Sequence, residues 1–326
     1  AVAAPGKVVV SGAPEGLDGK VAGELARAAG ERPVLHVARD DQRAAMLAEA
    51  ISFFHPDVEI LPFPAWDCLP YDRVSPAAEI LSRRLNALTR LAGGDLRCPA
   101  VILATANSVL QRVPPRDVIK QASFSAAPGN RVNTEELQDY LVKNGFSRTG
   151  TVVDPGDYAI RGGIIDIFPP GHEEPVRLDF FGDTLESLRS FDPQTQRTTH
   201  QLKQLKLDAA SEVLLTPETI SRFRTGYAAT FAGSQLNDAV YEAVSAGRRY
   251  QGMEHWLALF YEQLETILDY AGDCVISMDH LAEEAMDARR TQIAEYYDAR
   301  VEALSKDTFG APEYKPLPPG RMYLTG

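Results

Sequence analysis

Near the start of the chain, one short segment has residue types and a spacing suited to nucleotide binding. A phosphate-binding loop follows the pattern G-x-x-x-x-G-K-[ST], in which glycine N–H groups bind phosphates, the lysine meets the terminal phosphates and the hydroxyl binds Mg²⁺. Residues 14–21 follow this frame, with Gly19 and Lys20 in the expected places. Pro14 stands at the first glycine position and has no N–H, and Val21 cannot coordinate a metal ion. The segment therefore predicts a degenerate phosphate loop.

Acidic side chains in and beyond this loop also oppose a working ATP site. Glu15 and Asp18 would bring negative charge towards a triphosphate. The second half of an ATPase site would be an apolar strand ending in Asp-Glu, and the best candidate strand, residues 274–278, is followed by Asp279 without a neighbouring Glu. We interpret Asp279 as the N-cap of the next helix. Gly19, Lys20 and Asp279 are thus predicted to be an inactive remnant of a nucleotide site, with no cofactor; a working ATP site is the alternative.

The composition argues against several other classes of site. The cysteines, Cys68, Cys98 and Cys274, are odd in number and far apart, without a CxxC pair, so we expect no disulfide framework, no metal site and a reducing cytoplasm. A net charge of −12 opposes broad binding to nucleic acid. No apolar run reaches the roughly 18 residues needed to cross a bilayer, so no membrane partner is expected.

A second candidate site combines arginines with an aromatic ring in the middle of the chain. Period-two alternation places Val176, Leu178 and Phe180 on one strand face, and the other face receives Arg177, Asp179 and Phe181. The first face is the apolar one and is expected to be buried. An exposed aromatic beside arginines has the composition of a protein-binding hot spot.

Two interpretations of this aromatic face remain open. Arg161, in the preceding strand, joins the same patch if the strands pair in chain order. In the other interpretation, Phe181 packs under the region of Pro193 or another domain, and Arg177 merely pairs with Asp179 or Asp183.

The elements that must position these sites fall into three parts. Short apolar strands alternate with helical stretches in the first part, which predicts a mostly parallel sheet with helices on both faces. The expected strands are residues 7–10, 34–38, 60–63 and 100–105, and the helices are residues 19–29, 40–54 and 77–91. Residues 123–207 combine a helix at 134–144 with alternating strands and turn signals. Helical patterns return after residue 216, with a strand at 274–278 and a long helix at 281–304.

We therefore predict an α/β fold: a degenerate helicase-like sheet of the P-loop NTPase type with a small inserted α+β domain. The expected domains are residues 1–115, 123–209 and 214–326. Trp66 and Trp256 are expected to anchor domain packing, and Tyr158 and Phe168 to lie in the core. The pairs Arg83-Arg84 and Arg289-Arg290 are expected on exposed helix faces.

Longer blocks of the sequence resemble transcription-repair coupling factors (Mfd). The blocks are Pro64-Ala65-Trp66-Asp67-Cys68-Leu69-Pro70-Tyr71-Asp72, residues 158–169, Ser190-Phe191-Asp192-Pro193-Gln194-Thr195-Gln196-Arg197-Thr198 and Gly252-Met253-Glu254-His255-Trp256. Residues 156–198 are similar to the repair helicase UvrB as well. The chain departs from UvrB in its broken phosphate loop. It also leaves no room for a DNA-clamping hairpin between Tyr71-Asp72 and Arg83-Arg84.

The resemblance implies a UvrB-like body of domain 1a, inserted domain 2 and domain 1b. It implies that domain 2 recruits UvrA through Arg161, Arg177 and Phe181, with Arg189 as a weaker addition. The motor that binds RNA polymerase, hydrolyses ATP and translocates on double-stranded DNA would lie beyond Gly326. The expected function is therefore a non-catalytic adaptor. The alternatives are a UvrB-like ATP-dependent helicase subunit with residual nucleotide or DNA binding, and a binder of small molecules.

Overall fold

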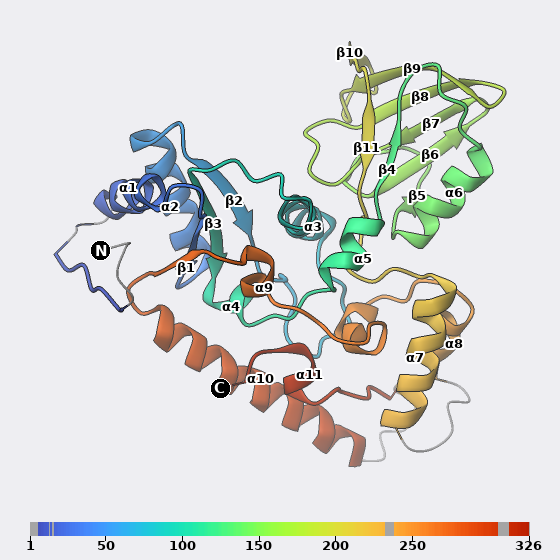
Figure 1. Cartoon of the computed structure of the whole chain (residues 1–326). Coiled ribbons are helices and arrows are strands. Elements are labelled where there is room, and N and C mark those ends of the chain that lie inside the picture. Colours follow the sequence, from blue (N-terminus) through green and yellow to red (C-terminus); the bar gives the residue numbers. More distant parts are fainter. Residues whose placement is uncertain (1–5, 13, 15, 232–237, 306–312, 326) are drawn as a thin grey trace.

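The computed structural model describes residues 6–12, 14, 16–231, 238–305 and 313–325. Its first body is built on a parallel sheet of four strands in the order β12-β1-β3-β2 (Figure 1). These strands are β1 (Val34–Ala38), β2 (Glu59–Phe63), β3 (Ala100–Thr105) and β12 (Val275–Met278). Central strands β1 and β3 are buried at every residue, as expected for a parallel sheet covered on both faces. The mixed α/β class predicted from the sequence is confirmed.

Helices cover both faces of this sheet because alternate strand residues point to opposite sides. On one side, α1 (Leu17–Ala29) and α2 (Asp41–Phe54) pack their apolar faces against Val34 and Val101. On the other side, α3 (Ala78–Gly93) packs against Leu35 and Ile102. The strands expected at 34–38, 60–63 and 100–105 and these three helices are thus confirmed within one or two residues.

The strand expected at residues 7–10 is wrong. This segment is irregular, and Val8, Val9 and Val10 are 65%, 77% and 65% exposed. Lys7 forms an ion pair with Glu283 at 3.1 Å. Apolar composition predicts an extended segment but cannot supply a strand partner, and the edge beside β1 is occupied by β12 from the other end of the chain.

The second body, at the upper right of Figure 1, is a small α+β unit. Its six-stranded sheet has the order β10-β9-β8-β7-β6-β5, all antiparallel apart from the β5–β6 pair. The strands are β5 (Ser147–Arg148), β6 (Asp157–Arg161), β7 (Ile164–Ile167), β8 (Val176–Phe181), β9 (Thr184–Phe191) and β10 (Thr198–Gln201). A second sheet joins β4 (Phe124–Ala126) to β11 (Leu205–Leu207).

One face of the six-stranded sheet forms a core with helix α6 (Thr134–Lys143). Its N-cap, Asn133, accepts hydrogen bonds from the N–H groups of Glu135 and Glu136. Tyr158 and Phe168 are 4% and 6% exposed, which confirms both as core residues.

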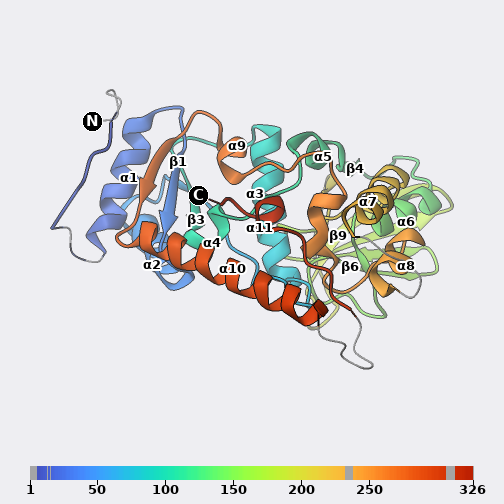
Figure 2. The same cartoon turned by 90° about the horizontal axis from the view of Figure 1, so that it is seen from below.

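The third body is mainly helical. It contains α7 (Pro217–Thr230), α8 (Ala239–Ser245), a 3-10 helix (Met253–Leu259) and α11 (Pro319–Met322). The 24-residue helix α10 (Ala282–Ser305) runs along one side of the molecule from the parallel sheet to these helices (Figures 1 and 2). Trp66 and Trp256 are both buried in the cluster that joins the first and third bodies, as predicted. No helix within the described ranges is long and apolar enough to span a bilayer.

Arg84 corrects the expectation of an exposed Arg83-Arg84 pair. Arg83 is exposed and pairs with Glu79, whereas Arg84 is fully buried, with its Nε 2.5 Å from Oε1 of Glu212. Consecutive helix residues are separated by about 100°, so α3 turns Arg84 towards the sheet when Arg83 faces solvent. Arg84 Nη1 also donates to the Pro64 carbonyl (2.8 Å) and to Gln111 Oε1 (3.0 Å).

Arg289 is a second exception of the same kind. It was expected on a solvated helix face, yet it is only 9% exposed and donates to Gln292 at 2.5 Å. One face of α10 packs against the body of the molecule, because the same helix contributes the buried Ala282 and Ile293.

The Arg84→Ala variant tests the importance of the buried ion pair. We expect it to lower the free energy of unfolding by about 3–5 kcal/mol, because Glu212 would remain as an uncompensated buried charge. Arg83→Ala is the matched control, since it removes only an exposed i,i+4 pair worth about 0.5 kcal/mol. Urea unfolding curves measure both. Equal stability of the two variants would contradict a structural role for Arg84.

Candidate functional site

In the segment predicted to be a degenerate phosphate loop, the backbone N–H groups are hydrogen-bonded to an acidic side chain of the same segment. The loop enters α1 through Gly16, which has φ +92° and precedes the first helical residue, Leu17. Oδ1 of Asp18 accepts hydrogen bonds from the backbone N–H groups of Gly16 (3.0 Å) and Gly19 (2.9 Å). Such N–H groups at a helix N-terminus are the ones that would bind a phosphate. Asp18 therefore occupies with a carboxylate the donors that a nucleotide would need.

Arg43 connects this loop to the end of β12. Its guanidinium, 6% exposed, forms ion pairs with Asp18 and with Asp279, where Nε lies 3.1 Å from Oδ2. The prediction that Asp279 is the N-cap of the next helix is wrong, because α10 begins three residues later, at Ala282. The Asp279 carboxylate forms the ion pair with Arg43 instead. The Asp18–Arg43–Asp279 cluster brings together two of the acidic residues considered in the sequence for a nucleotide site. Both carboxylates form ion pairs with the buried Arg43.

The other residues of the predicted nucleotide site do not converge on this cluster. Lys20 is exposed and contributes its backbone carbonyl to a hydrogen bond with His55 Nε2 at 3.1 Å. Pro14 and Val21 are exposed, and Glu15 lies outside the described residues.

The close packing of α1 against α2 explains why residue 19 is a glycine. This residue is buried inside α1, and a Cβ placed on it would lie 2.4 Å from Cβ of Ala50 and 2.9 Å from the backbone carbon of the same residue. Gly23, one turn later, faces His55 in the same way. The glycines thus allow α1 and α2 to approach closely.

Metal ligands and reactive thiols do not add to this site. Within the part of the chain that the structure describes, no group of three or more His, Cys, Asp or Glu side chains is arranged to hold a metal ion. Cys68, Cys98 and Cys274 are free and partly buried. Burial raises the pKa of Cys68 to about 12, so its thiol stays protonated at neutral pH.

The second candidate site is one face of the six-stranded sheet. Strands β6, β7, β8 and β9 pair in chain order, so residues opposite one another share a face. One cross-strand row contains Asp166, Arg177 and Arg189. The next row contains Arg161, Ile164, Asp179 and Ser187. Beyond a bulge after Asp179, Phe181 pairs with Thr184. The four residues singled out from the sequence therefore lie on the same face, which we call the arginine face.

Phe181 is a large apolar side chain of this face that is exposed to solvent. It is 78% exposed and precedes the turn residue Gly182, whose φ of +59° suits glycine. The interpretation that Phe181 packs under the region of Pro193 is therefore wrong. Phe180, next to it, is partly buried against the core on the opposite face.

Arg177 is held rigidly by partners inside the same domain. Its Nε and Nη2 donate to the two carboxylate oxygens of Asp166 at 2.7 and 2.9 Å, and Asp166 is 2% exposed. The guanidinium also lies over the Phe191 ring, 4.7 Å from its centroid. The hydrogen bond to Asp166 raises the pKa of Arg177, so the arginine stays charged. The partner is thus Asp166, and the predicted pairing with Asp179 or Asp183 is wrong.

The two remaining arginines differ in their partners. Arg189 forms an ion pair with Asp179, which also accepts a hydrogen bond from Ser187 at 2.6 Å. Burial alone would raise the pKa of Asp179, but the hydrogen bonds from Ser187 and Arg189 hold it below its ordinary value. Among the residues that the structure describes, Arg161 donates to uncharged groups, the Gly150 carbonyl and the Thr151 hydroxyl.

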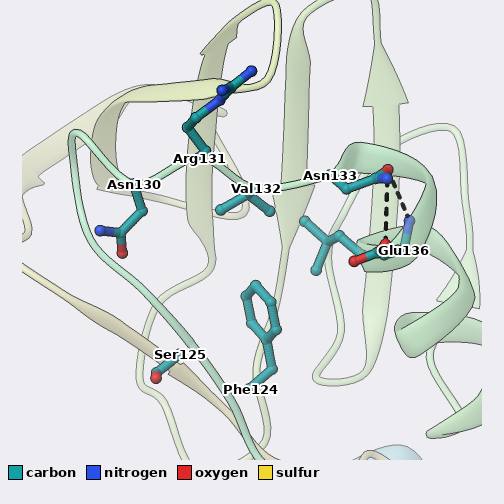
Figure 3. A pocket seen from close by; sticks show the side chains of 8 residues that line it. Phe124, Ser125, Asn130, Arg131, Val132, Asn133 and Glu136 are labelled. Carbon is teal, nitrogen blue, oxygen red and sulfur yellow. Dashed lines mark hydrogen bonds between the residues drawn. The ribbon is translucent and has the colours of Figure 1, made fainter.

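Arg131 is a residue of this face that sequence reasoning missed. The segment 129–132 runs beside β9 through an isolated antiparallel bridge between Arg131 and Thr184. Arg131 is one of the residues that line a cavity of about 440 Å³, and Figure 3 shows its side chain extending away from the side chains of Val132 and Phe124. A single bridge leaves no alternating pattern in the sequence, so no local signal places Arg131 beside Thr184.

A Gly19→Ala variant tests the role of Gly19 in the packing of α1 against α2. We expect the free energy of unfolding to fall by about 1–3 kcal/mol, because the added methyl group would overlap the backbone of α2. The expected fall is the net change, after the gain of about 1 kcal/mol in helix propensity has been subtracted. Gly150→Ala is the control, since a Cβ at Gly150 meets nothing within 4 Å. Thermal unfolding measures both, and unchanged stability of Gly19→Ala would contradict the close helix contact.

Comparison with known proteins assigns this arrangement to a family. Residues 124–212 match the UvrB interaction domain family. The chain is 32% identical over 291 residues to the transcription-repair-coupling factor of Rickettsia bellii (strain RML369-C), covering 89% of this chain and 25% of the relative. Identity to the corresponding protein of Myxococcus xanthus is 38% over 275 residues, covering 79% of this chain and 23% of the relative.

The same relationship extends to the transcription-repair-coupling factor of Escherichia coli (strain K12). It is 34% identical over 239 residues, covering 73% of this chain and 20% of the relative. The chain spans about a quarter or less of the length of these relatives. The resemblance predicted from the sequence is thereby confirmed: the chain is related over most of its length to transcription-repair-coupling factors, and residues 124–212 belong to the UvrB interaction domain family.

Proposed function

We propose that this chain is an adaptor module of transcription-coupled repair that recruits UvrA through the arginine face. In this proposal residues 1–115 form domain 1a, residues 123–209 domain 2 and residues 214–326 domain 1b. The observation that carries the proposal is the exposed ring of Phe181 on a hydrogen-bonded strand within the segment that matches the UvrB interaction domain. Phe181 is the anchor of the contact, and Arg161, Arg177 and Arg189 lie on the same face, farther from the turn.

Burial of Phe181 by a partner supplies the favourable free energy. When an aromatic ring that is 78% exposed enters a pocket of the partner, a large apolar surface is removed from contact with water. The strand that carries it is backed by a packed core, so little conformational entropy is lost on binding. A rigid aromatic of this kind is typical of the few residues that dominate an interface.

The arginines contribute orientation more than binding energy. Arg177 and Arg189 already have carboxylate partners in the domain, and these ion pairs hold their side chains in fixed positions. No carboxylate in the described ranges balances the charge of Arg161, which donates to neutral groups. Such charges steer the approach of an acidic surface and fix its register.

Nucleotide chemistry is absent from the proposed role. The N–H groups at the start of α1 bind Asp18, and Arg43 connects that carboxylate to Asp279, so a triphosphate would have to displace an internal ion-pair cluster. The chain itself therefore hydrolyses no ATP and needs no cofactor. In the longer protein, ATP-driven translocation on double-stranded DNA and contact with RNA polymerase belong to segments outside this chain.

Two variants separate binding from folding at the arginine face. Phe181→Ala should weaken binding to UvrA by about 2 kcal/mol or more, roughly thirtyfold, with unchanged unfolding, because the ring touches solvent. Arg177→Ala should weaken binding and also lower the free energy of unfolding by about 3 kcal/mol, because Asp166 would remain buried without its partner. Calorimetric titration with purified UvrA and urea unfolding of the same samples measure both effects.

Phe53→Ala is the control for Phe181→Ala, because Phe53 is 80% exposed on α2, outside the domain. It should bind UvrA like the unmodified chain. Unchanged affinity of Phe181→Ala would sink the assignment of the arginine face, and an unmodified chain that folds but binds no UvrA would overturn the adaptor role.

Thermal unfolding with and without millimolar Mg²⁺-ATP tests the absence of a nucleotide site. We expect the same midpoint in both conditions, since a ligand raises stability only by binding the folded state. Lys20→Ala should behave identically. If ATP raises the unfolding midpoint of the unmodified chain but not that of Lys20→Ala, the result would instead favour the UvrB-like ATPase.

A further inference from the structure

The arginine face extends one strand position beyond β9. The backbone of segment 129–132 is hydrogen-bonded to this hairpin: Gly129 N–H donates to the Leu185 carbonyl (2.7 Å), and Leu185 N–H donates to the Asn130 carbonyl (3.0 Å). Val132 N–H donates to the Asp183 carbonyl at 2.8 Å. A segment that begins more than 50 residues earlier in the sequence therefore lies beside the turn that presents Phe181.

Register places Arg131 in the same cross-strand row as Phe181. Arg131 is opposite Thr184, and Thr184 is opposite Phe181, so the three side chains emerge on one face. Neighbouring strands are about 4.8 Å apart, which puts the backbones of Arg131 and Phe181 about 10 Å from each other. An arginine side chain is long enough to cover much of that separation. One partner surface can therefore contact both residues.

The charge of Arg131 is available to a partner. Arg177 and Arg189 are paired with Asp166 and Asp179. The guanidinium of Arg131, by contrast, forms no ion pair or hydrogen bond with any residue in the described ranges, and the side chain is exposed. Figure 3 shows the side chain extending away from those of Val132, which is buried, and Phe124. A cation held on an ordered backbone beside an exposed aromatic is complementary to a carboxylate.

We infer that Arg131 is a further contact residue of the arginine face and meets an acidic side chain of UvrA beside the pocket that receives Phe181. This inference rests on the proposed function and adds to it a residue outside the strands that carry the other four. Since Arg131 lies at the rim of the face, its charge acts mainly on the rate of association and on its salt dependence.

The side chain of Arg131 can be replaced without loss of the segment. The three backbone hydrogen bonds to the β8–β9 hairpin do not involve the guanidinium, and Val132, 8% exposed, anchors the segment in the core. Variants of Arg131 therefore report on the charge of the surface and leave the fold of the domain intact.

Charge reversal provides the test, with the whole chain as the sample. Association and dissociation rates with purified UvrA are measured at low and high salt for Arg131→Glu, Arg131→Ala and Phe181→Ala. Arg224→Glu is the matched control: Arg224 is exposed on α7, outside residues 124–212, and its reversal changes the net charge by the same amount. Urea unfolding verifies that each variant is folded.

We expect Arg131→Glu to bind about tenfold more weakly than Arg224→Glu at low salt, mostly through slower association, because an acidic partner is now repelled. The difference should shrink at high salt, where exposed charges are screened. Arg131→Ala should give an intermediate loss. If Phe181→Ala weakens binding and Arg131→Glu matches Arg224→Glu, the inference is wrong and the proposed function stands. If Phe181→Ala has no effect, or UvrA does not bind at all, both are overturned.

Discussion

The buried ion pair between Arg84 and Glu212 is the interaction on which the arrangement of the three bodies depends. Arg84 belongs to α3 of the first body, and Glu212 lies where the chain leaves the inserted unit. The Glu212 carbonyl accepts a hydrogen bond from Tyr261 of the third body at 2.8 Å. Removing two charges from water is costly, so such a pair persists only when every donor and acceptor is satisfied. Pro64, Gln111 and the ring of Phe63 complete its surroundings.

A second set of internal ion pairs lies at the start of α1, where a helicase-like sheet would bind a nucleotide. Asp18 takes the N–H groups at the start of α1, and Arg43 balances Asp18 against Asp279. These ion pairs connect the start of α1, helix α2 and the end of edge strand β12. In the adaptor proposed above, the parallel sheet and its helices would serve as a scaffold, because Asp18, Arg43 and Asp279 are paired with one another.

The two faces of the six-stranded sheet differ in how far they are buried. One face forms a packed core with α6, which makes the sheet rigid. On the other face, ion pairs hold Arg177 and Arg189 in place while Phe181 stays uncovered. An exposed aromatic ring is costly for an isolated domain, and a partner that covers the ring removes this cost. The rigidity of the sheet and the proposed contact with UvrA therefore involve opposite faces of the same strands.

Local patterns in the sequence determined the strands at 34–38 and 100–105, the helices around them and the common face of Arg177 and Phe181, because period and burial are properties of neighbouring residues. Tertiary structure alone decided the rest. Residues 7–10 look like a strand but pair with no strand in the described part of the chain, and Arg84 looks like the exposed Arg83 but is buried against Glu212. Arg131 joins the arginine face through a single bridge. Each of these outcomes depends on a residue far away in the chain, which no local pattern encodes.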